Sequence, residues 1–260
     1  MKMYDLAYTL DATLPSGALH VPFRMALTMR HGDMVRADGG SAAQEMLSLG
    51  GHIGTHLDAL AHASLDGRLY GGVDAEEASR GGWFKVLGIE TVPPRISRGI
   101  LLDPTCFYDH EPLPAGLGIT SDLLARTATE ERVQVCPDDA VFVRTGWPDR
   151  CLGDREAFLG LQTGVPGIDV SGAQYLLDGG ATLIGADTLA VEQILPLIGH
   201  SSLPVHSLLL VSAGVHILEM LDLASLANDR QWEFLLVLIP LKLRGATASP
   251  VRPLALVDSA

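Results

Sequence analysis

The segment from His52 to His62 brings together side chains that can bind a metal ion. It contains His52, His56, Asp58 and His62 within eleven residues, and it holds three of the nine histidines of the chain. Imidazole nitrogens suit borderline cations such as zinc, and an aspartate oxygen suits harder cations such as manganese. Two imidazoles and one carboxylate leave coordination positions open. The residue types therefore predict a zinc or manganese site with room for water.

The spacing within this segment favours an extended backbone. The offsets from His52 to the other three residues are 4, 6 and 10, and an extended chain directs even offsets to one side. On a helix, Asp58 would lie well around the barrel from His52. Gly51 and Gly54 also disfavour a helix interior, and they allow the backbone to approach a bound ion closely. We therefore predict a strand that runs into a loop.

Apolar runs of strand length recur along the chain and separate helical patterns from one another. The predicted strands are Phe84–Ile89, Ile100–Asp103, Ala140–Thr145, Ala181–Asp187, Val215–Met220, Phe234–Ile239 and Leu254–Val257. N-capping residues and closing glycines predict helices over Thr120–Arg132, Asp169–Asp178 and His206–Ala213. This order of elements predicts an α/β fold with a mixed sheet.

The chain has no segment that is typical of a flexible linker, and no internal repeat is visible. We therefore expect a single domain over residues 1–260. The loop Pro104–Ile119, which contains three prolines, is the best candidate for a long surface excursion.

Composition and charge exclude several classes of partner. Hydrophobic residues make up 47% of the chain and charged residues 19%, which is typical of a folded globular protein. Eighteen Lys and Arg residues against 31 Asp and Glu residues give a formal net charge of −13. No basic cluster interrupts this balance, so we expect neither a nucleic-acid partner nor binding to an anionic membrane.

Several features predict a cytoplasmic location. Asp5 and Asp11 interrupt any apolar segment that could serve as a secretory signal. The longest apolar stretch, Phe234 to Leu241, is far shorter than the ~20 residues that a membrane-spanning helix needs. The three cysteines have no CxxC spacing, so they fit a reducing compartment and provide no disulfide framework.

The segment HIGTHLDALAH resembles the signature HxGTHxDxPxH of the cyclase family of metal-dependent hydrolases, which includes bacterial kynurenine formamidases and isatin hydrolases. The chain carries every signature residue in register, except that Leu60 replaces the usual proline. Further segments similar to family motifs are Tyr4–Leu6, Arg144–Trp147, Pro166–Ile168, Gly185–Thr188, Pro240–Leu243 and Ser249–Pro253. The resemblance therefore extends through the whole chain.

This resemblance implies a fold, an assembly and a set of roles. The fold is the swivelling β/β/α fold of the family, and the assembly is a homodimer or homotetramer. His52, His56 and Asp58 would hold a divalent metal ion, and His62 would act as the proton shuttle.

The resemblance also implies a second metal position, so that one or two ions bind per subunit. His206 and Glu219 match the residues that hold the second ion in the formamidases, although the interval between them is one residue longer here. Taken without the resemblance, they are equally well interpreted as a histidine at a helix start and a carboxylate in a strand. A carboxylate in an apolar strand needs a partner in either case.

A serine hydrolase and a non-catalytic metal-binding protein are the alternatives to a metal-dependent hydrolase. The segment Gly199–Leu203 is similar to the GxSxG turn of serine hydrolases, which would make Ser201 a nucleophile. Leu203 replaces the second glycine, however, and no histidine follows Asp222 to complete the order Ser, Asp, His. A non-catalytic metal-binding protein would normally close its site with four ligands, often cysteines, and none of the cysteines lies near the cluster.

The hypothesis is hydrolysis of a small carbonyl compound, an amide, lactam, imide or lactone, by metal-activated water with His62 as the base. Formamidases of the family carry a tryptophan near the N-terminus that lines the pocket for an aromatic substrate. This chain has no tryptophan from Leu14 to Met34, and Phe23, Met25 and Met29 occupy the matching region. We therefore predict a compact cyclic substrate, with its ring-opened carboxylate held by a nearby arginine. N-formylkynurenine is the alternative substrate.

Overall fold

A computed structural model describes residues 1–17, 20–109 and 111–258. Its main feature is a nine-stranded sheet in the order β1-β13-β11-β5-β7-β9-β10-β4-β12. These strands are β1 Lys2–Asp5, β4 His56–Asp58, β5 Arg95–Leu102, β7 Ala140–Val143, β9 Leu183–Ala186, β10 His216–Glu219, β11 Glu233–Leu238, β12 Ala248–Pro250 and β13 Leu254–Val257.

The four central strands β5, β7, β9 and β10 run parallel to one another, and the strands outside them pair antiparallel. The sheet is therefore mixed, which confirms the predicted α/β class. The remaining strands are β2 Arg24–Met29 with β3 Gln44–Ser48, and β6 Gly118–Ile119 with β8 Gly167–Ile168.

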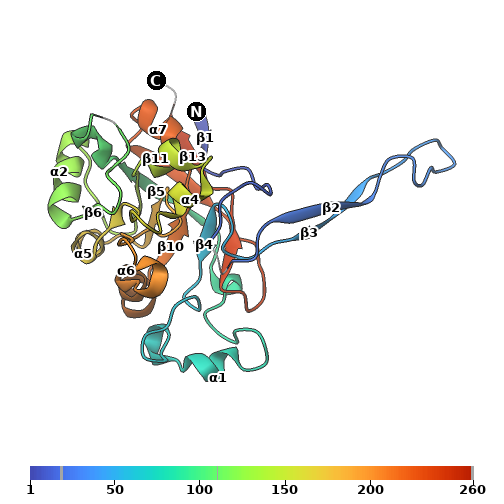
Figure 1. The fold of residues 1–260 in the computed structure, drawn as a ribbon, viewed down its shortest axis with the longest axis horizontal. Helices are drawn as coiled ribbons and strands as arrows, with labels where there is room; N and C mark the ends of the chain where they lie inside the picture. The colour runs from blue at the N-terminus through green and yellow to red at the C-terminus, as the bar shows by residue number, and fades with distance from the viewer. Residues whose placement is uncertain (18–19, 110, 259–260) are drawn as a thin grey trace.

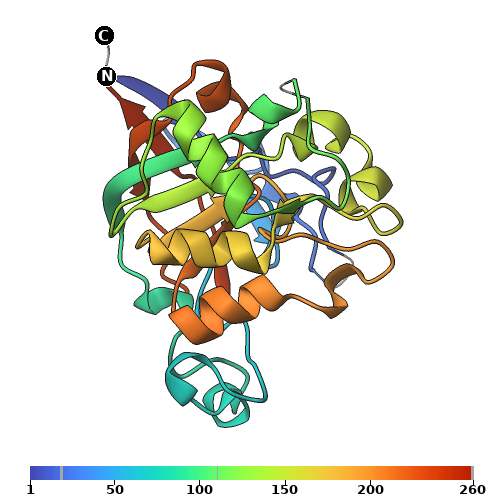
Figure 2. The ribbon, with the colours of Figure 1, turned by 90° about the vertical axis from the view of Figure 1, so that its left-hand side faces the viewer.

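Helices cover one face of the sheet (Figures 1 and 2). The α-helices are α1 Ala75–Ser79, α2 Ser121–Glu131, α3 Trp147–Cys151, α4 Arg155–Leu159, α5 Val170–Asp178, α6 Pro204–His206 and α7 Ala224–Asn228, and a π-helix, η5, spans Ser207–Ala213. Helices α2, α5, α6 and η5 share one hydrophobic cluster with the sheet face beneath them. Among the described residues, no helix is long and apolar enough to cross a membrane.

The central strands are buried on both faces, as parallel strands usually are. In β7, Val141 and Val143 point into the cluster below the helices, whereas Ala140 and Phe142 point into the cluster on the opposite face. Strands β7 and β9 are buried at every position and carry only apolar residues, which explains why they appear in the sequence as continuous apolar runs.

Most predicted elements form, and their ends differ from the predicted ones by at most five residues. Thr120 caps α2 by accepting from the backbone N–H of Leu123, and Asp169 caps α5 in the same way through Gly172. The predicted helix at 206–213 begins earlier, at Pro204, and becomes a π-helix that ends at Ala213 and is followed by Gly214 as its C-cap.

The predicted strand Phe84–Ile89 is wrong. Leu87 has a left-handed backbone with a φ of 61°, so the segment cannot continue as an extended strand. Two isolated backbone hydrogen bonds, from Phe84 and Ile89 to Gly245 and Ala246, hold the segment in place instead.

The loop Pro104–Ile119 is not the long excursion that the sequence predicts. It contains a 3₁₀ turn at Pro104–Phe107 and the short strand β6, and its Leu113 is fully buried. The segment that projects from the body is the hairpin of β2 and β3, whose outer end lies far from the sheet in Figure 1. Its strand side chains are almost all exposed, so no buried apolar face marked it in the sequence.

Candidate metal centre

The centre is built on two neighbouring antiparallel strands, β4 and β10. Their register places His56 opposite Glu219 and Asp58 opposite Ile217. His56 and Asp58 are two residues apart, so both side chains point to the same side of β4. Ile217 belongs to the cluster beneath the helices, which shows that the centre lies on the helix-covered face of the sheet.

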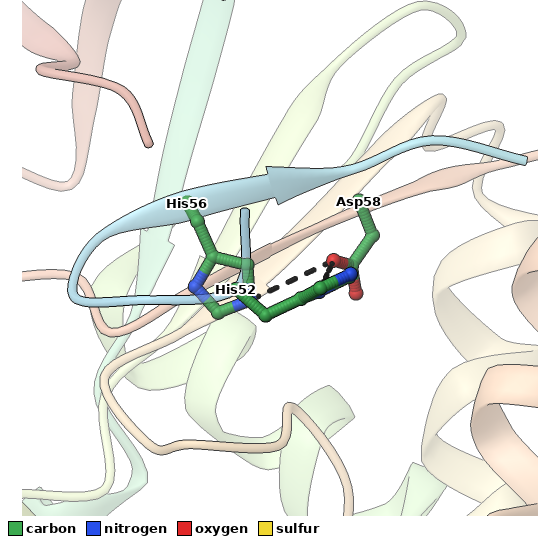
Figure 3. Close-up of side chains that lie close together, drawn as sticks. All are labelled: His52, His56 and Asp58. Carbon is green, nitrogen blue, oxygen red and sulfur yellow. Dashed lines mark ion pairs between the residues drawn. The ribbon is translucent and has the colours of Figure 1, made fainter. Parts of the chain in front are cut away.

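His52 reaches the centre from the turn that precedes β4. The predicted strand therefore begins only at His56, and residues 51–55 form bends (Figure 3). Gly54 makes this turn possible, because its φ is 59° and a Cβ there would lie 2.4 Å from the Leu10 side chain. The Thr55 hydroxyl accepts from the backbone N–H of Tyr8 at 3.1 Å and donates to the carbonyl of Met220.

The first group of candidate ligands is His52, His56 and Asp58. The Nδ1 atom of His52 lies 2.8 Å from Oδ1 of Asp58, and Nε2 of His56 lies 3.6 Å from the same oxygen. One ligand atom from each of the three residues lies within 4.8 Å of the other two. The structure thus brings together the three residues predicted to hold the first ion.

The second group shares Asp58 with the first. Asp58, His62 and His206 also have ligand atoms within 4.8 Å of one another. The Nε2 atoms of His62 and His206 each lie 4.0 Å from Oδ2 of Asp58. The carboxylate of Glu219 lies between the two groups, with Oε2 3.2 Å from Nε2 of His56 and Oε1 3.3 Å from Nε2 of His206.

Four histidines surround Asp58, namely His52, His56, His62 and His206. In three of them the ring nitrogen that points away from Asp58 contacts an oxygen atom. Nδ1 of His56 lies 2.7 Å from the carbonyl of Gly54, and Nε2 of His52 lies 3.0 Å from the hydroxyl of Thr247. Nδ1 of His206 lies 2.6 Å from Glu192. Such contacts orient ligand histidines and leave the inner nitrogen free to bind a metal ion.

The residues present fit a divalent cation. Asp58 is fully buried, and neither of its carboxylate oxygens accepts a well-formed hydrogen bond from the described residues. A buried carboxylate in this state needs a positive partner. Imidazole nitrogens and carboxylate oxygens converging on it are the donor set of zinc and manganese sites.

The electrostatics of the centre also favour positive charge. Burial opposes ionisation of Asp58, but His62, His52 and His56 hold the pKa of Asp58 well below its usual range. Burial disfavours the charged form of His56, yet Glu219 and Asp58 outweigh it and raise the pKa of His56 to about 9. Burial is likewise outweighed at His206, where Glu192 and Glu219 raise the pKa to about 10. Without a metal ion, protonated His56 and His206 balance the negative charge of these carboxylates, and a divalent ion would replace those protons.

His62 differs from the other three histidines. Its side chain is 28% exposed, compared with 14% for His52 and less for the other two. Within the described part of the chain, its ring makes ion-pair and ring contacts but no hydrogen bond. Burial lowers the pKa of His62 to about 4, even though Asp58 opposes this shift. His62 is therefore in its neutral form at pH 7.

Sequence reasoning missed three side chains around the centre. Glu192 and Thr247 contact the outer nitrogens of His206 and His52, and the ring of His20 lies 5.6 Å from that of His52 between centroids. A carboxylate inside the apolar run LAVEQIL was a visible signal for Glu192. Nothing in the local sequence marks the other two.

The structure bears on two sequence-based hypotheses about the surroundings. Met25 and Met29 belong to β2, which extends away from the body, so they do not line the centre (Figure 1). The hydroxyl of Ser201 donates to the carbonyl of Ile198 at 2.7 Å and not to a histidine, which gives no support to a serine nucleophile.

Comparisons with known proteins show which family the chain belongs to. A family model described as "Putative cyclase" matches residues 4–193. Isatin hydrolase from Roseibium aggregatum is 30% identical over 235 residues, which cover 86% of this chain and 78% of that protein. A solved structure described as "a novel cyclase" has a TM-score of 0.86 at 28% identity and covers 98% of this chain and 88% of its own. Isatin hydrolase A from Ralstonia solanacearum shares the fold, with a TM-score of 0.76 at 24% identity over 99% of this chain and 92% of its own.

The chain belongs to the cyclase family, and it is a hydrolase of that family. This confirms the resemblance that the signature segment indicated. The fold class is confirmed by the same comparisons.

Proposed function

We propose that this hydrolase cleaves a C–N or C–O bond in a compact cyclic amide, lactam, imide or lactone. The observation that supports this most directly is the buried Asp58 carboxylate, whose two oxygens face two groups of histidines and accept no well-formed hydrogen bond from the described residues. The 30% identity with an isatin hydrolase supports a cyclic amide as the substrate class, because isatin is a lactam.

The residues of the chain would divide the chemistry between them. His52, His56 and Asp58 would hold a zinc or manganese ion, and His206 with Glu219 would hold a second one. A bound ion acts as a Lewis acid on the substrate carbonyl and lowers the pKa of the attacking water. His62 takes a proton from that water and returns it to the leaving nitrogen or oxygen as the bond breaks. General base catalysis of this kind contributes typically ~10²–10⁴-fold to the rate.

The properties of His62 support this role. A base must be neutral at the working pH and must be reachable by water. The lowered pKa of His62 satisfies the first condition, and its exposure satisfies the second. His56 and His206 satisfy neither, since both are buried and both have raised pKa values.

The experiment that tests this function is a hydrolysis panel on protein of known metal content. Metal-free protein is loaded with zinc or manganese and assayed with isatin, a small lactam, a small imide, a small lactone and N-formylkynurenine. We expect turnover of at least one cyclic compound that depends on added metal and is absent in Asp58→Asn. Full activity in the metal-free protein would contradict the proposal.

N-formylkynurenine is kept as the second substrate because the family signature is shared with formamidases. Its aromatic ring needs a flat apolar wall, and the described residues near the centre offer the imidazole of His20 in place of a tryptophan. Cyclic compounds are therefore the first choice.

We also propose that the protein is a homodimer or homotetramer. An isolated two-stranded hairpin is marginally stable in water. Hairpin β2–β3 nevertheless exposes Met25, Leu27, Met46 and Leu47, each by more than half of its surface. A second subunit would cover these side chains. Light scattering that finds only monomers at micromolar concentration would contradict this proposal.

A further inference from the structure

Glu192 lies in a short segment that is fixed to the body of the protein. The segment follows β9 and pairs with β8, since the backbone N–H of Ile168 donates to the carbonyl of Val191 and that of Gln193 donates to the carbonyl of Ile168, both at 3.1 Å. Only 1% of the surface of Glu192 is exposed. Its carboxylate therefore has a defined position and no access to solvent.

Among the described residues, the hydrogen bonds of the Glu192 carboxylate all go to the start of the helix that carries His206. Its Oε1 accepts from the backbone N–H of His206 at 2.8 Å and from the ring Nδ1 at 2.6 Å, and its Oε2 accepts from the backbone N–H of Val205 at 3.1 Å. A carboxylate can only accept, so Nδ1 of His206 must carry a hydrogen. The other ring nitrogen is thereby directed toward Glu219 and Asp58.

Val191, the residue before Glu192, contacts Glu219, which is the second candidate ligand beside His206. The backbone N–H of Val191 donates to Oε1 of Glu219 at 3.2 Å. One dipeptide thus contacts both His206 and Glu219, whereas His52 and His56 are held by other residues, Thr247 and Gly54.

We propose that Glu192 is a positioning residue for His206, which fixes the direction of its Nε2 atom and so prepares only the second half of the centre for a metal ion. The inference rests on the proposed function for the role of the metal, but the position of the His206 ring can be tested without any substrate. Contacts of this kind typically change metal affinity by ~10–100-fold when they are removed.

The same arrangement explains Gly167 in the family motif Pro166–Ile168. A Cβ at Gly167 would lie 2.2 Å from the carbonyl carbon of Glu192 and 2.3 Å from its oxygen, so only glycine allows the two backbones to pack this closely. Gly167→Ala should therefore displace Glu192 without removing its charge. It provides a second variant that tests the same relationship.

The test compares wild type with Glu192→Gln, Gly167→Ala and a matched control, Glu131→Gln. Glu131 is another buried carboxylate that accepts from a backbone N–H, in this case from Asp103 at 2.8 Å, and it is not a neighbour of the candidate ligands. Circular dichroism first establishes that each variant is folded. Calorimetric titration of metal-free protein with Mn²⁺ then measures the affinity of each ion.

We expect Glu192→Gln and Gly167→Ala to weaken binding of the second ion by ~10–100-fold and to leave the first ion unchanged. The control should bind both ions as wild type does. Any loss of turnover in Glu192→Gln should be recovered at higher Mn²⁺ concentration, because the residue acts through occupancy of the site. Equal affinities in wild type and both variants would overturn the proposal.

NMR of metal-free protein with ¹⁵N-labelled histidine gives a readout that is independent of metal and substrate. We expect a hydrogen-bonded Nδ1–H proton of His206 far downfield in wild type and in the control, moved upfield in both variants. If wild type binds only one ion, this signal decides the question, and an unchanged signal in both variants overturns the proposal. If these signals behave as expected but no substrate is hydrolysed, the proposed function fails and the positioning role stands.

Discussion

Glu219 lies directly across from His56 in the pairing of β10 with β4, and its Oε2 is 3.2 Å from Nε2 of that histidine. Cross-strand partners keep this relation because the ladder of backbone hydrogen bonds sets the register. The candidate metal centre therefore has one rigid side made of the sheet. Its other side consists of the turn with His52 and the helix start with His206, which are held by hydrogen bonds to Thr247 and Glu192.

The first prediction concerns the ion that we propose His52, His56 and Asp58 to hold. His52→Ala or Asp58→Asn should abolish both metal content and turnover, because each removes a ligand that the remaining two cannot replace. Elemental analysis of protein purified without added metal, together with the hydrolysis panel, measures both. His31→Ala on the exposed hairpin is a matched control, and it should keep wild-type metal content. Full metal retention in either ligand variant would refute the assignment.

The second prediction separates a base from a ligand at His62. His62→Ala should keep most of the metal and reduce kcat by ~10²–10⁴-fold, because the ring is the proposed proton acceptor. Added imidazole should restore part of the activity, since the deletion leaves space at a partly exposed position. The opposite pattern, in which metal is lost and imidazole has no effect, would make His62 a ligand of the second group with Asp58 and His206.

The third prediction concerns the number of ions. If His206 and Glu219 hold a second ion, wild type should reach two ions per chain in a titration, and Glu219→Gln should reach one. The reason is that the amide oxygen of glutamine is a weaker metal ligand than the carboxylate oxygen of glutamate. A ratio that never exceeds one in wild type would contradict this and leave Glu219 to steer His56 and His206 through its two carboxylate oxygens.

How much of the site could be predicted depends on whether its residues are close in sequence. The segment from His52 to His62 can be recognised from the sequence, because four side chains that can bind a metal ion lie among apolar neighbours. The even spacing correctly indicated that these side chains converge, but for a partly wrong reason, since His52 returns through a turn at Gly54. Glu192 and Thr247 approach from distant segments, and only the three-dimensional fold brings them to the histidines.

The fold also contains some elements that the sequence predicts and others that it does not. Central strands such as β7 and β9 could be predicted because both faces are buried and every residue is apolar. Strands β2 and β3 could not, since their side chains are almost all exposed and carry no alternation. The failed strand at Phe84–Ile89 depends on one left-handed residue, Leu87, and leucine gives no signal for that conformation.

The fourth prediction concerns pH and the buried carboxyl of Glu131 on α2. Burial raises its pKa to about 8; the backbone N–H of Asp103 opposes this shift, and the charges of Asp103 and Glu130 add to it. Oε2 of Glu131 is buried without a hydrogen-bond partner among the described residues. The folded protein therefore binds this proton more tightly than the unfolded chain, whose glutamates titrate near ~4.3.

The sign of the effect follows from that difference. Stability is unaffected by this group below the unfolded pKa, and it is lost progressively as the pH rises from about 4 to about 8. Glu131→Gln cannot ionise, so it should match wild type near pH 4 and be more stable at pH 8.5, by on the order of 3–5 kcal/mol. Urea unfolding of both proteins at the two pH values measures this. Parallel pH profiles would show that the carboxyl is already ionised in the folded protein.

The fifth prediction concerns the substrate. The region from Leu14 to Met34 contains no tryptophan, and the structure carries much of it away from the centre in β2, leaving the ring of His20 beside His52. An aromatic contact is worth ~0.5–1.5 kcal/mol beyond the area that it buries, which corresponds to a factor of roughly 2–13 in binding. An N-formylkynurenine ring would lose that contact, whereas a small lactam or lactone needs no such wall.

We therefore expect kcat/KM to be higher for a small lactam or lactone than for N-formylkynurenine when all are measured on the same metal-loaded protein. His20→Trp supplies a flat aromatic ring at the position beside His52, and it should raise kcat/KM for N-formylkynurenine while leaving the value for the small lactam within about threefold, since the ~0.5–1.5 kcal/mol of an aromatic contact applies only to the larger ring. If wild type prefers the formyl compound by tenfold or more, the described surroundings of the centre already accept an aromatic substrate, and the formamidase assignment replaces the cyclic one.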